Sequence, residues 1–252
     1  ALPPPRRYWW TPGYIMMFLK NIIEVQGMRI QAREELLNAS AYDMILVNSF
    51  YSRESVLKAY GIEAKVCYLG IDTDLFRPSN VPNEDFVVGL GAIHPIKGIE
   101  RAIFAIGMIK RNKRPDLVWI GNFSNQFYQK KIMALASSLE VNLIIRVGLT
   151  DPEMIDIISR ASVMIYTSRL EPFGFAPLEA NACETPVVAI AEGGVRESIK
   201  NGINGILIDD DNPVAIGEAI LRLINDKAYA RKLGENGRQL VLNKWSLDAS
   251  IE

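Results

Sequence analysis

The sequence predicts an α/β fold, a doubly wound parallel sheet. From Asp85 onward, short apolar runs alternate with longer helical patterns. The runs are rich in β-branched residues and almost continuously hydrophobic, which is typical of parallel strands buried on both faces. The segments between them have apolar residues three and four positions apart, as helices that pack on a sheet do. Strand alternating with helix implies right-handed βαβ crossovers, and such sheets bind ligands beyond the carboxyl ends of their strands.

Six strands and three clear helices are expected in this part of the chain. The expected strands are residues 86–90, 117–120, 143–147, 163–166, 187–190 and 205–208. The clearest helices are residues 99–110, 127–139 and 213–224. These elements form one complete domain with an apolar core.

The chain before Asp85 has a different organisation. Helices are expected at residues 21–41 and 52–60, a buried strand at 44–49 and a short strand at 64–68. Residues 79–85 are polar and contain a proline, as a linker does. We therefore place a domain boundary there, with 1–78 as the end of one domain and 79–252 as the next. The first part has too few strands for a complete domain, and with its abrupt start without Met it indicates a fragment of a longer chain.

Composition narrows the class of partner. The 252 residues carry 28 basic and 29 acidic side chains, a formal charge of -1, so nothing global indicates nucleic acid. Cys67 and Cys183 have no metal-type or redox-type spacing, and a reducing cytoplasm is the default expectation. We find no secretory signal and no apolar run long enough to span a bilayer.

The aromatic and basic opening leaves two interpretations. With Met16-Met-Phe-Leu it is suited to peripheral contact with a membrane at its cytoplasmic face, or with a lipid-linked acceptor. The more ordinary interpretation is a core element whose packing partner is missing.

The most informative stretch follows the expected strand at 163–166. It runs from Ser168 through Glu171, Gly174 and Pro177 to Glu179. A glycine lets the backbone approach a ligand closely, and the free amides at a helix start attract anions. A carboxylate at the start of the helix is placed to accept hydrogen bonds from sugar hydroxyls. A second carboxylate, about two helical turns further on, is placed to accept them from a ribose diol. The alternative is a purely structural interpretation, in which the Glu171 carboxylate interacts favourably with the helix dipole, Glu179 forms a surface ion pair and Gly174 lies in a turn.

Two further glycine-containing loops follow expected strands. The first holds Gly91, Lys97 and Gly98, where the lysine either neutralises a phosphate or is a solvated residue at a helix start. The second, Glu192-Gly-Gly-Val-Arg-Glu, exposes the amides of Gly193 and Gly194. Three such loops at strand ends converge on one crevice, and this convergence is more informative than any single loop.

The ordered motifs resemble the retaining glycosyltransferases of the two-domain GT-B type that include the phosphatidylinositol mannosyltransferases and sucrose synthase. That family carries G-R-x-x-x-x-K-G, then E-x-F-G-x-x-x-x-E, G-G-x-x-E and N-G-x-x-G. Here the last three stand as Glu171-Pro-Phe-Gly-Phe-Ala-Pro-Leu-Glu179, Gly193-Gly-Val-Arg-Glu197 and Asn201-Gly-Ile-Asn-Gly205. The segment 70–78 looks like the family's interdomain segment, and the resemblance covers roughly residues 44–245.

The resemblance implies that residues 79–252 bind a nucleotide-sugar donor. It implies catalytic roles for Lys97, on the diphosphate, and Glu171, on donor-sugar hydroxyls, while Glu179 would bind the ribose. The remaining implied donor contacts are Gly91, Val147, Leu149, Phe173, Gly174, Phe175, Gly193 and Gly194, with the base near Val147 and Leu149. It also implies retaining transfer of a mannose- or glucose-type hexose from a UDP- or GDP-sugar to a glycan or lipid-linked acceptor, with no metal and no other cofactor.

Two departures from the family pattern keep other classes of protein open: Ala92, and the absence of about the first two-thirds of the N-terminal domain. Ala92 stands where the family usually has an arginine, and Arg169 and Arg196 are the candidates to replace it. His94, the only histidine, lies in the same loop and is expected to be a packing or solvent-facing residue. The alternatives are a nucleotide-binding module or regulatory remnant without turnover, and a sugar-nucleotide epimerase of GT-B fold. The Glu171–Glu179 motif argues against the epimerase.

Overall fold

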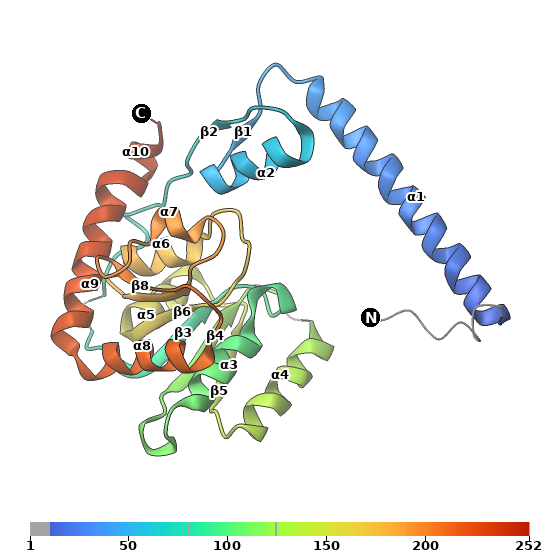
Figure 1. The fold of residues 1–252 in the computed structure, drawn as a ribbon. Helices are drawn as coiled ribbons and strands as arrows, with labels where there is room; N and C mark the ends of the chain where they lie inside the picture. The colour runs from blue at the N-terminus through green and yellow to red at the C-terminus, as the bar shows by residue number, and fades with distance from the viewer. Residues whose placement is uncertain (1–10, 80, 124, 252) are drawn as a thin grey trace. The chain divides into compact units, whose positions relative to one another are not determined.

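The computed structural model describes residues 11–79, 81–123 and 125–251, which divide into two units (Figure 1). The first contains the described residues up to Leu46, together with Ser55–Lys65; the second contains Val47–Glu54 and the chain from Val66 onward. The aromatic and basic opening up to Trp10 lies outside the described residues. No helix in the described ranges combines the length and hydrophobicity needed to cross a bilayer.

The first unit is dominated by one helix, α1 (Pro12–Ser40). It begins nine residues earlier than the predicted start at 21, because the Thr11 side chain caps it by accepting from the Tyr14 amide at 3.3 Å and Pro12 occupies its first turn. None of the α1 side chains is buried.

Two short strands and a helix follow α1. Strands β1 (Leu46–Val47) and β2 (Lys65–Val66) form a two-stranded sheet, and α2 (Phe50–Tyr60) lies between them in sequence. The prediction of a buried strand over 44–49 was wrong: β1 has two residues, and Leu46 is 57% exposed. The apolar side chains of 44–49 led to the prediction of a buried strand, but β1 is not buried by the other described residues.

The second unit contains a six-stranded sheet whose neighbouring strands all pair in parallel. The strands are β3 (Glu84–Leu90), β4 (Asp116–Gly121), β5 (Leu143–Val147), β6 (Ala161–Tyr166), β7 (Val187–Ile190) and β8 (Gly205–Ile208). Their order is β5-β4-β3-β6-β7-β8, the doubly wound, Rossmann-like order in which the winding reverses between β3 and β6. All six predicted strands are confirmed within about two residues at each end.

Helices cover both faces of this sheet (Figure 1). Strand side chains alternate between the two faces: Val87 and Ile165 belong to one core, and Val88 and Met164 to the other. The first core includes side chains of α3 (Ile99–Met108), α4 (Gln126–Ser138), α8 (Pro213–Asn225) and α9 (Lys227–Leu240). The second includes α5 (Asp151–Arg160), α6 (Phe175–Ala182), α7 (Val195–Ser198) and the π-helical turn η4 (Val241–Trp245). The 3₁₀ turns η2 (Pro95–Lys97) and η3 (Arg111–Lys113) and the last helix α10 (Leu247–Ile251) complete the described elements.

The segment before the predicted linker packs with the sheet. Ile71 and Phe76 are buried in the second core, and Arg238 on α9 donates to the carbonyls of Phe76 and Thr73 at 2.6 and 3.1 Å. The domain boundary after residue 78 stays a prediction. What the contacts show is that residues 66–78 belong to the same compact unit as the sheet.

Candidate functional site

A cavity of about 650 Å³ lies at the carboxyl ends of the central strands, where the winding of the sheet reverses. Its lining includes Leu90 and Tyr166, the last residues of β3 and β6, and Gly121, the last of β4. It also includes the predicted donor-site residues Gly91, Lys97, Leu149, Glu171, Phe173, Gly174, Phe175 and Glu179. These residues come from loops and from helix α6, parts of the chain that are far apart in sequence, and the topology brings them to one edge of the sheet.

Glu171 is the polar centre of the cavity. Its two carboxylate oxygens accept separately from the Lys97 ammonium and the Tyr166 hydroxyl. Burial raises the pKa of Glu171, but the hydrogen bonds from Lys97 and Tyr166 outweigh burial and bring the pKa below its ordinary value. Burial, and then the Glu171 carboxylate, raise the pKa of Tyr166, so its hydroxyl keeps its proton and donates. The site therefore holds an ionised carboxylate beside a cation.

The loop that carries Lys97 is shaped by its neighbours. The Trp119 indole nitrogen donates to the Gly91 carbonyl at 2.9 Å, which fixes the end of β3. Gly91 has φ 145°, and a Cβ there would lie 3.0 Å from the Lys97 side chain. A residue with a side chain at this position would be strained and would crowd the lysine. His94, the residue in this loop that we expected to pack or face solvent, is exposed and caps η2 by accepting from the Ile96 amide at 3.4 Å.

The turn after Glu171 leads directly into α6. Gly174 has φ 83°, and a Cβ built on it would lie 2.6 Å from the Tyr166 hydroxyl oxygen. Phe175 and Ala176, which open the helix, line the cavity. The positive end of the helix dipole therefore meets the cavity, an arrangement that favours an anionic ligand.

Glu179 and Asp151 are two carboxyl groups in the lining of this cavity. Burial, with a smaller contribution from the charge of Asp151, raises the pKa of Glu179 to about 7. Asp151 is the first residue of α5, where the Thr150–Glu153 capping box fixes the helix start. Near neutral pH the Glu179 carboxyl is thus poised between its charged and neutral forms.

Three predicted donor contacts do not line the cavity. Val147 is the last residue of β5 and is 47% exposed. The Gly194 amide donates to the Glu171 carbonyl at 3.0 Å, so it supports the backbone of the glutamate loop instead of facing a ligand. A Cβ on Gly193 would lie 2.5 Å from the same carbonyl oxygen. These two glycines pack behind Glu171, and donor contact by any of the three residues stays a prediction.

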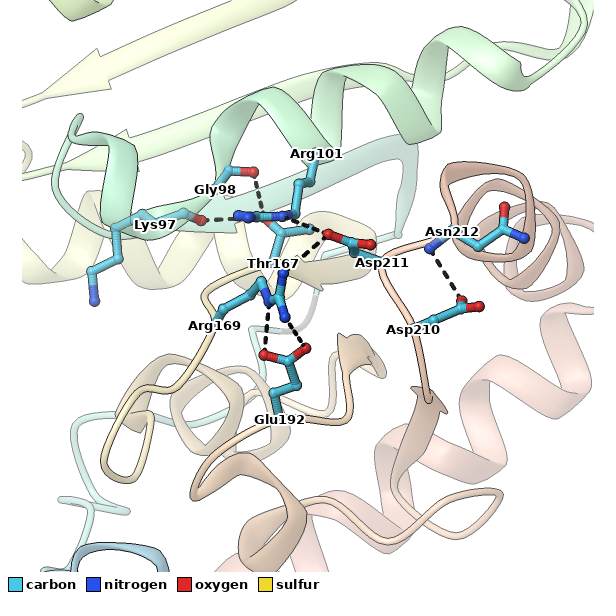
Figure 2. A network of polar contacts seen from close by, with 9 residues as sticks. All are labelled: Lys97, Gly98, Arg101, Thr167, Arg169, Glu192, Asp210, Asp211 and Asn212. Carbon is cyan, nitrogen blue, oxygen red and sulfur yellow. Dashed lines mark hydrogen bonds and ion pairs between the residues drawn. The ribbon is translucent and has the colours of Figure 1, made fainter. Parts of the chain in front are cut away.

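A polar network ties four loops together beside the cavity (Figure 2). Arg169 forms two contacts of 2.7 Å with the Glu192 carboxylate and a longer one of 3.4 Å with Asp211, which Arg101 also contacts at 3.3 Å. The buried Thr167 hydroxyl bonds the Gly98 carbonyl at 2.9 Å and lies 3.2 Å from that of Lys97. The Lys97 ammonium points away from the two arginines of this network.

Neither arginine proposed to replace the family's missing one lies in the cavity lining. Arg169 is engaged in this network, and the Arg196 guanidinium donates to the Ala191 carbonyl. Lys97 is the basic side chain that the described lining contains. The family resemblance of the loop is therefore carried by the lysine and the glycines.

Sequence reasoning missed four polar residues of the lining: Asn48, Asn122, Asp151 and Tyr166. Tyr166 was assigned to a strand, and its position at the strand's carboxyl end, five residues before Glu171, was the available indication of a role. Asp151 follows Thr150 in a recognisable capping box. Nothing local marks Asn48, because its place in the site depends on contacts more than 100 residues away in sequence.

Metal-binding geometry is not evident among these groups. Over residues 11–79, 81–123 and 125–251, no cluster of three or more His, Cys, Asp or Glu side chains is arranged to hold an ion. Asp72-Thr-Asp74 has the Asp-x-Asp spacing of some metal sites, but Asp72 accepts from the Asp74 and Leu75 amides at 3.1 and 2.9 Å. Asp72 therefore closes a turn.

The doubly wound sheet, with a cavity at the reversal point of its strand order, is the fold of the GT-B glycosyltransferases. Residues 71–240 match the family Glycosyl transferases group 1, and the chain belongs to that family. Among curated relatives, D-inositol 3-phosphate glycosyltransferase 1 of Catenulispora acidiphila is 27% identical over 211 residues, covering 75% of this chain and 50% of the relative. The chain spans about half the length of the curated relatives it matches.

Solved structures give the same fold. Sucrose-phosphate synthase from Thermosynechococcus elongatus superposes with a TM-score of 0.79 at 26% identity, over 88% of this chain and 59% of that one. Anabaena Alr3699/HepE, solved in complex with UDP-glucose, has a TM-score of 0.78 at 22% identity, over 87% of this chain and 64% of that one.

Proposed function

We propose that this chain is the donor-binding part of a retaining hexosyltransferase that uses a UDP- or GDP-sugar. In this proposal the hexose is of mannose or glucose type, the acceptor is a glycan or lipid-linked, and transfer needs no metal. Residues 79–252 are the donor domain, and residues 1–78 the end of the acceptor-side domain. The observation that carries the proposal is that Lys97, Glu171 and Glu179, distant in sequence, line one cavity at the reversal point of the sheet.

The chemistry of the cavity supports a ligand with an anionic centre and hydroxyl groups. Lys97 and the start of α6 suit a diphosphate, because an ammonium and oriented helix amides stabilise negative charge. Glu171, held ionised, suits donor-sugar hydroxyls, and Glu179 suits a ribose diol. The structural neighbour solved with UDP-glucose is consistent with such a ligand.

In this arrangement the reaction takes its electrostatic support from Lys97. As the bond between sugar and diphosphate breaks, negative charge grows on the leaving phosphate oxygen. A lysine that is already positioned stabilises that charge without reorganising. Glu171 holds the sugar on the same side of the cavity, and Tyr166 keeps the carboxylate in place by its hydrogen bond.

Calorimetric titration with UDP, GDP and ADP and the matching sugar nucleotides, with and without magnesium, tests the proposal. Glu179→Ala should weaken binding of the free nucleotide by roughly 1–3 kcal/mol, the usual loss of a hydrogen bond to a charged group. Glu171→Ala should weaken binding of the sugar nucleotide by a similar amount, because the proposed partner of Glu171 is the sugar. It should not weaken binding of the free nucleotide, because removal of the carboxylate releases Lys97. Glu235→Ala, at an exposed position on α9, is the matched control and should change neither affinity.

Equal effects of the two changes on both ligands would show that the roles are wrongly assigned. Absence of binding, and of any rise in melting temperature, with all three nucleotides would refute the donor site itself. Binding that requires magnesium would refute the metal-free part.

A further inference from the structure

The segment Val47–Glu54 is anchored to the donor-site loops of the same unit. Ser49 is fully buried, and its hydroxyl donates to the Pro172 carbonyl at 2.5 Å. The Glu197 carboxylate accepts from the amides of Phe50 and Tyr51, both at 3.0 Å, and from the Tyr68 hydroxyl at 2.7 Å. Glu197 thus caps the start of α2 instead of facing the cavity.

This anchoring brings Asn48 into the lining of the cavity. Ser49, its neighbour in sequence, donates to the carbonyl of Pro172, the residue that follows Glu171, and Asn48 and Glu171 both line the cavity. Lys97 belongs to the same lining. An asparagine amide is neutral, so it adds hydrogen-bonding capacity to this charged pair without disturbing its balance.

The orientation of the Asn48 amide follows from its neighbours. The Ser52 amide donates to the Ser49 oxygen, whose own proton goes to Pro172. The Ser52 hydroxyl is then free to donate, and it lies 2.9 Å from Asn48 Oδ1. With Oδ1 satisfied, the Nδ2 group has two protons to donate, and no partner for it lies among the described residues.

We propose that Asn48 is a further binding residue of this cavity, whose amide nitrogen donates to an oxygen of the glycosyl part of the sugar nucleotide beside Glu171. The proposal rests on the proposed function. It adds a contact from the segment before the sheet, so one hexose is held by residues from two separate parts of the sequence. A diphosphate oxygen offers the same acceptor chemistry, and the test separates the two.

The test compares Asn48→Ala with the wild-type chain by calorimetry, using UDP, UDP-glucose, GDP and GDP-mannose. Loss of one neutral hydrogen bond should weaken the sugar nucleotide about threefold to tenfold and leave the free diphosphate within about twofold. Asn48→Leu keeps the branched shape of the side chain and removes both donor and acceptor. It should give the same difference between the two ligands if the alanine variant folds poorly. Ser52→Ala should give a smaller loss for the sugar nucleotide, because the amide remains but is no longer oriented.

Each outcome has a separate meaning. Unchanged affinities in the Asn48 variants, with a wild-type chain that binds both ligands, would overturn the assignment. Equal loss for the free diphosphate and the sugar nucleotide would overturn contact with the sugar in favour of contact with phosphate. Failure of the wild-type chain to bind any of the four ligands would refute the proposed function instead.

Discussion

Glu179 makes binding of the nucleotide dependent on pH in a direction that its surroundings determine. Burial and Asp151 raise its pKa to about 7, so about one-tenth of the free protein carries the carboxylate at pH 6 and about nine-tenths at pH 8. A ribose diol donates better to the ionised form. Nucleoside diphosphate affinity should therefore rise by up to about tenfold from pH 6 to pH 8.

Stability of the ligand-free protein should change in the opposite direction. A carboxyl whose folded pKa is raised contributes stability that is fully present below its unfolded pKa and is lost as pH rises through the folded pKa. For Glu179 that window runs from about 4.5 to about 7. The shift corresponds to at most about 3 kcal/mol, so Glu179→Gln should be more stable than wild type at pH 8 by up to that amount. Below pH 4.5 the two should converge.

The assay is a pH series of calorimetric titrations and denaturant unfolding on wild type, Glu179→Gln and Asp151→Asn. The glutamine variant controls for titration of the ligand's phosphates, since it binds the same ligand without an ionisable group. Asp151→Asn should lower the pKa of Glu179 and move the rise in affinity to lower pH. Parallel affinity curves for wild type and Glu179→Gln between pH 6 and 8 would refute the reasoning.

Two further substitutions test the loops around the cavity. Ala92→Arg should tighten nucleoside diphosphate binding about tenfold, or about 1.5 kcal/mol, because Arg169 and Arg196 are engaged elsewhere. Calorimetry at two salt concentrations should show that the gain in affinity shrinks in high salt. Unchanged affinity at low salt would contradict the prediction. Gly194→Ala should lower the free energy of unfolding by about 1–3 kcal/mol and weaken sugar-nucleotide binding, because its Cβ would meet the Pro172 carbonyl oxygen at 2.0 Å. Gly107→Ala in α3, whose Cβ would meet Leu139 at an ordinary 3.4 Å, is the control, and equal denaturant midpoints for the two variants would count against the role of Gly194.

The sheet could be predicted because its strands are buried on both faces. Residues such as Val87, Val88 and Ile165 make the apolar runs nearly continuous, and the runs have no competing helical period. The beginning of α1 was predicted nine residues too late, because Thr11 and Pro12 were not recognised as the cap and first turn of the helix. Helices α5 and α9 were not singled out, although Thr150 and Glu153 form a capping box at the start of α5.

The lining of the candidate site could be predicted for residues that belong to a local sequence motif. Lys97, Glu171 and Glu179 each belong to a motif with a glycine or proline beside it, and the structure places all three in one cavity. Asn48 lies there through the bond from Ser49 to a carbonyl 123 positions away in sequence, which no local pattern encodes. The amides of Gly193 and Gly194 looked available from the motif, but only the fold shows that the Gly194 amide meets the Glu171 carbonyl.

In the proposed function, we expect the ion pair between Lys97 and Glu171 to make the cavity selective for the whole sugar nucleotide. The Glu171 carboxylate offsets the charge of the Lys97 ammonium, so an anion gains less from this lysine than it would from a lysine without a partner. Inorganic phosphate has no sugar hydroxyls to donate to the Glu171 carboxylate, and a free sugar has no anionic group to pair with the lysine. A sugar nucleotide supplies both the anionic diphosphate and the sugar hydroxyls. The pair therefore favours the whole ligand over fragments that carry only one of these groups.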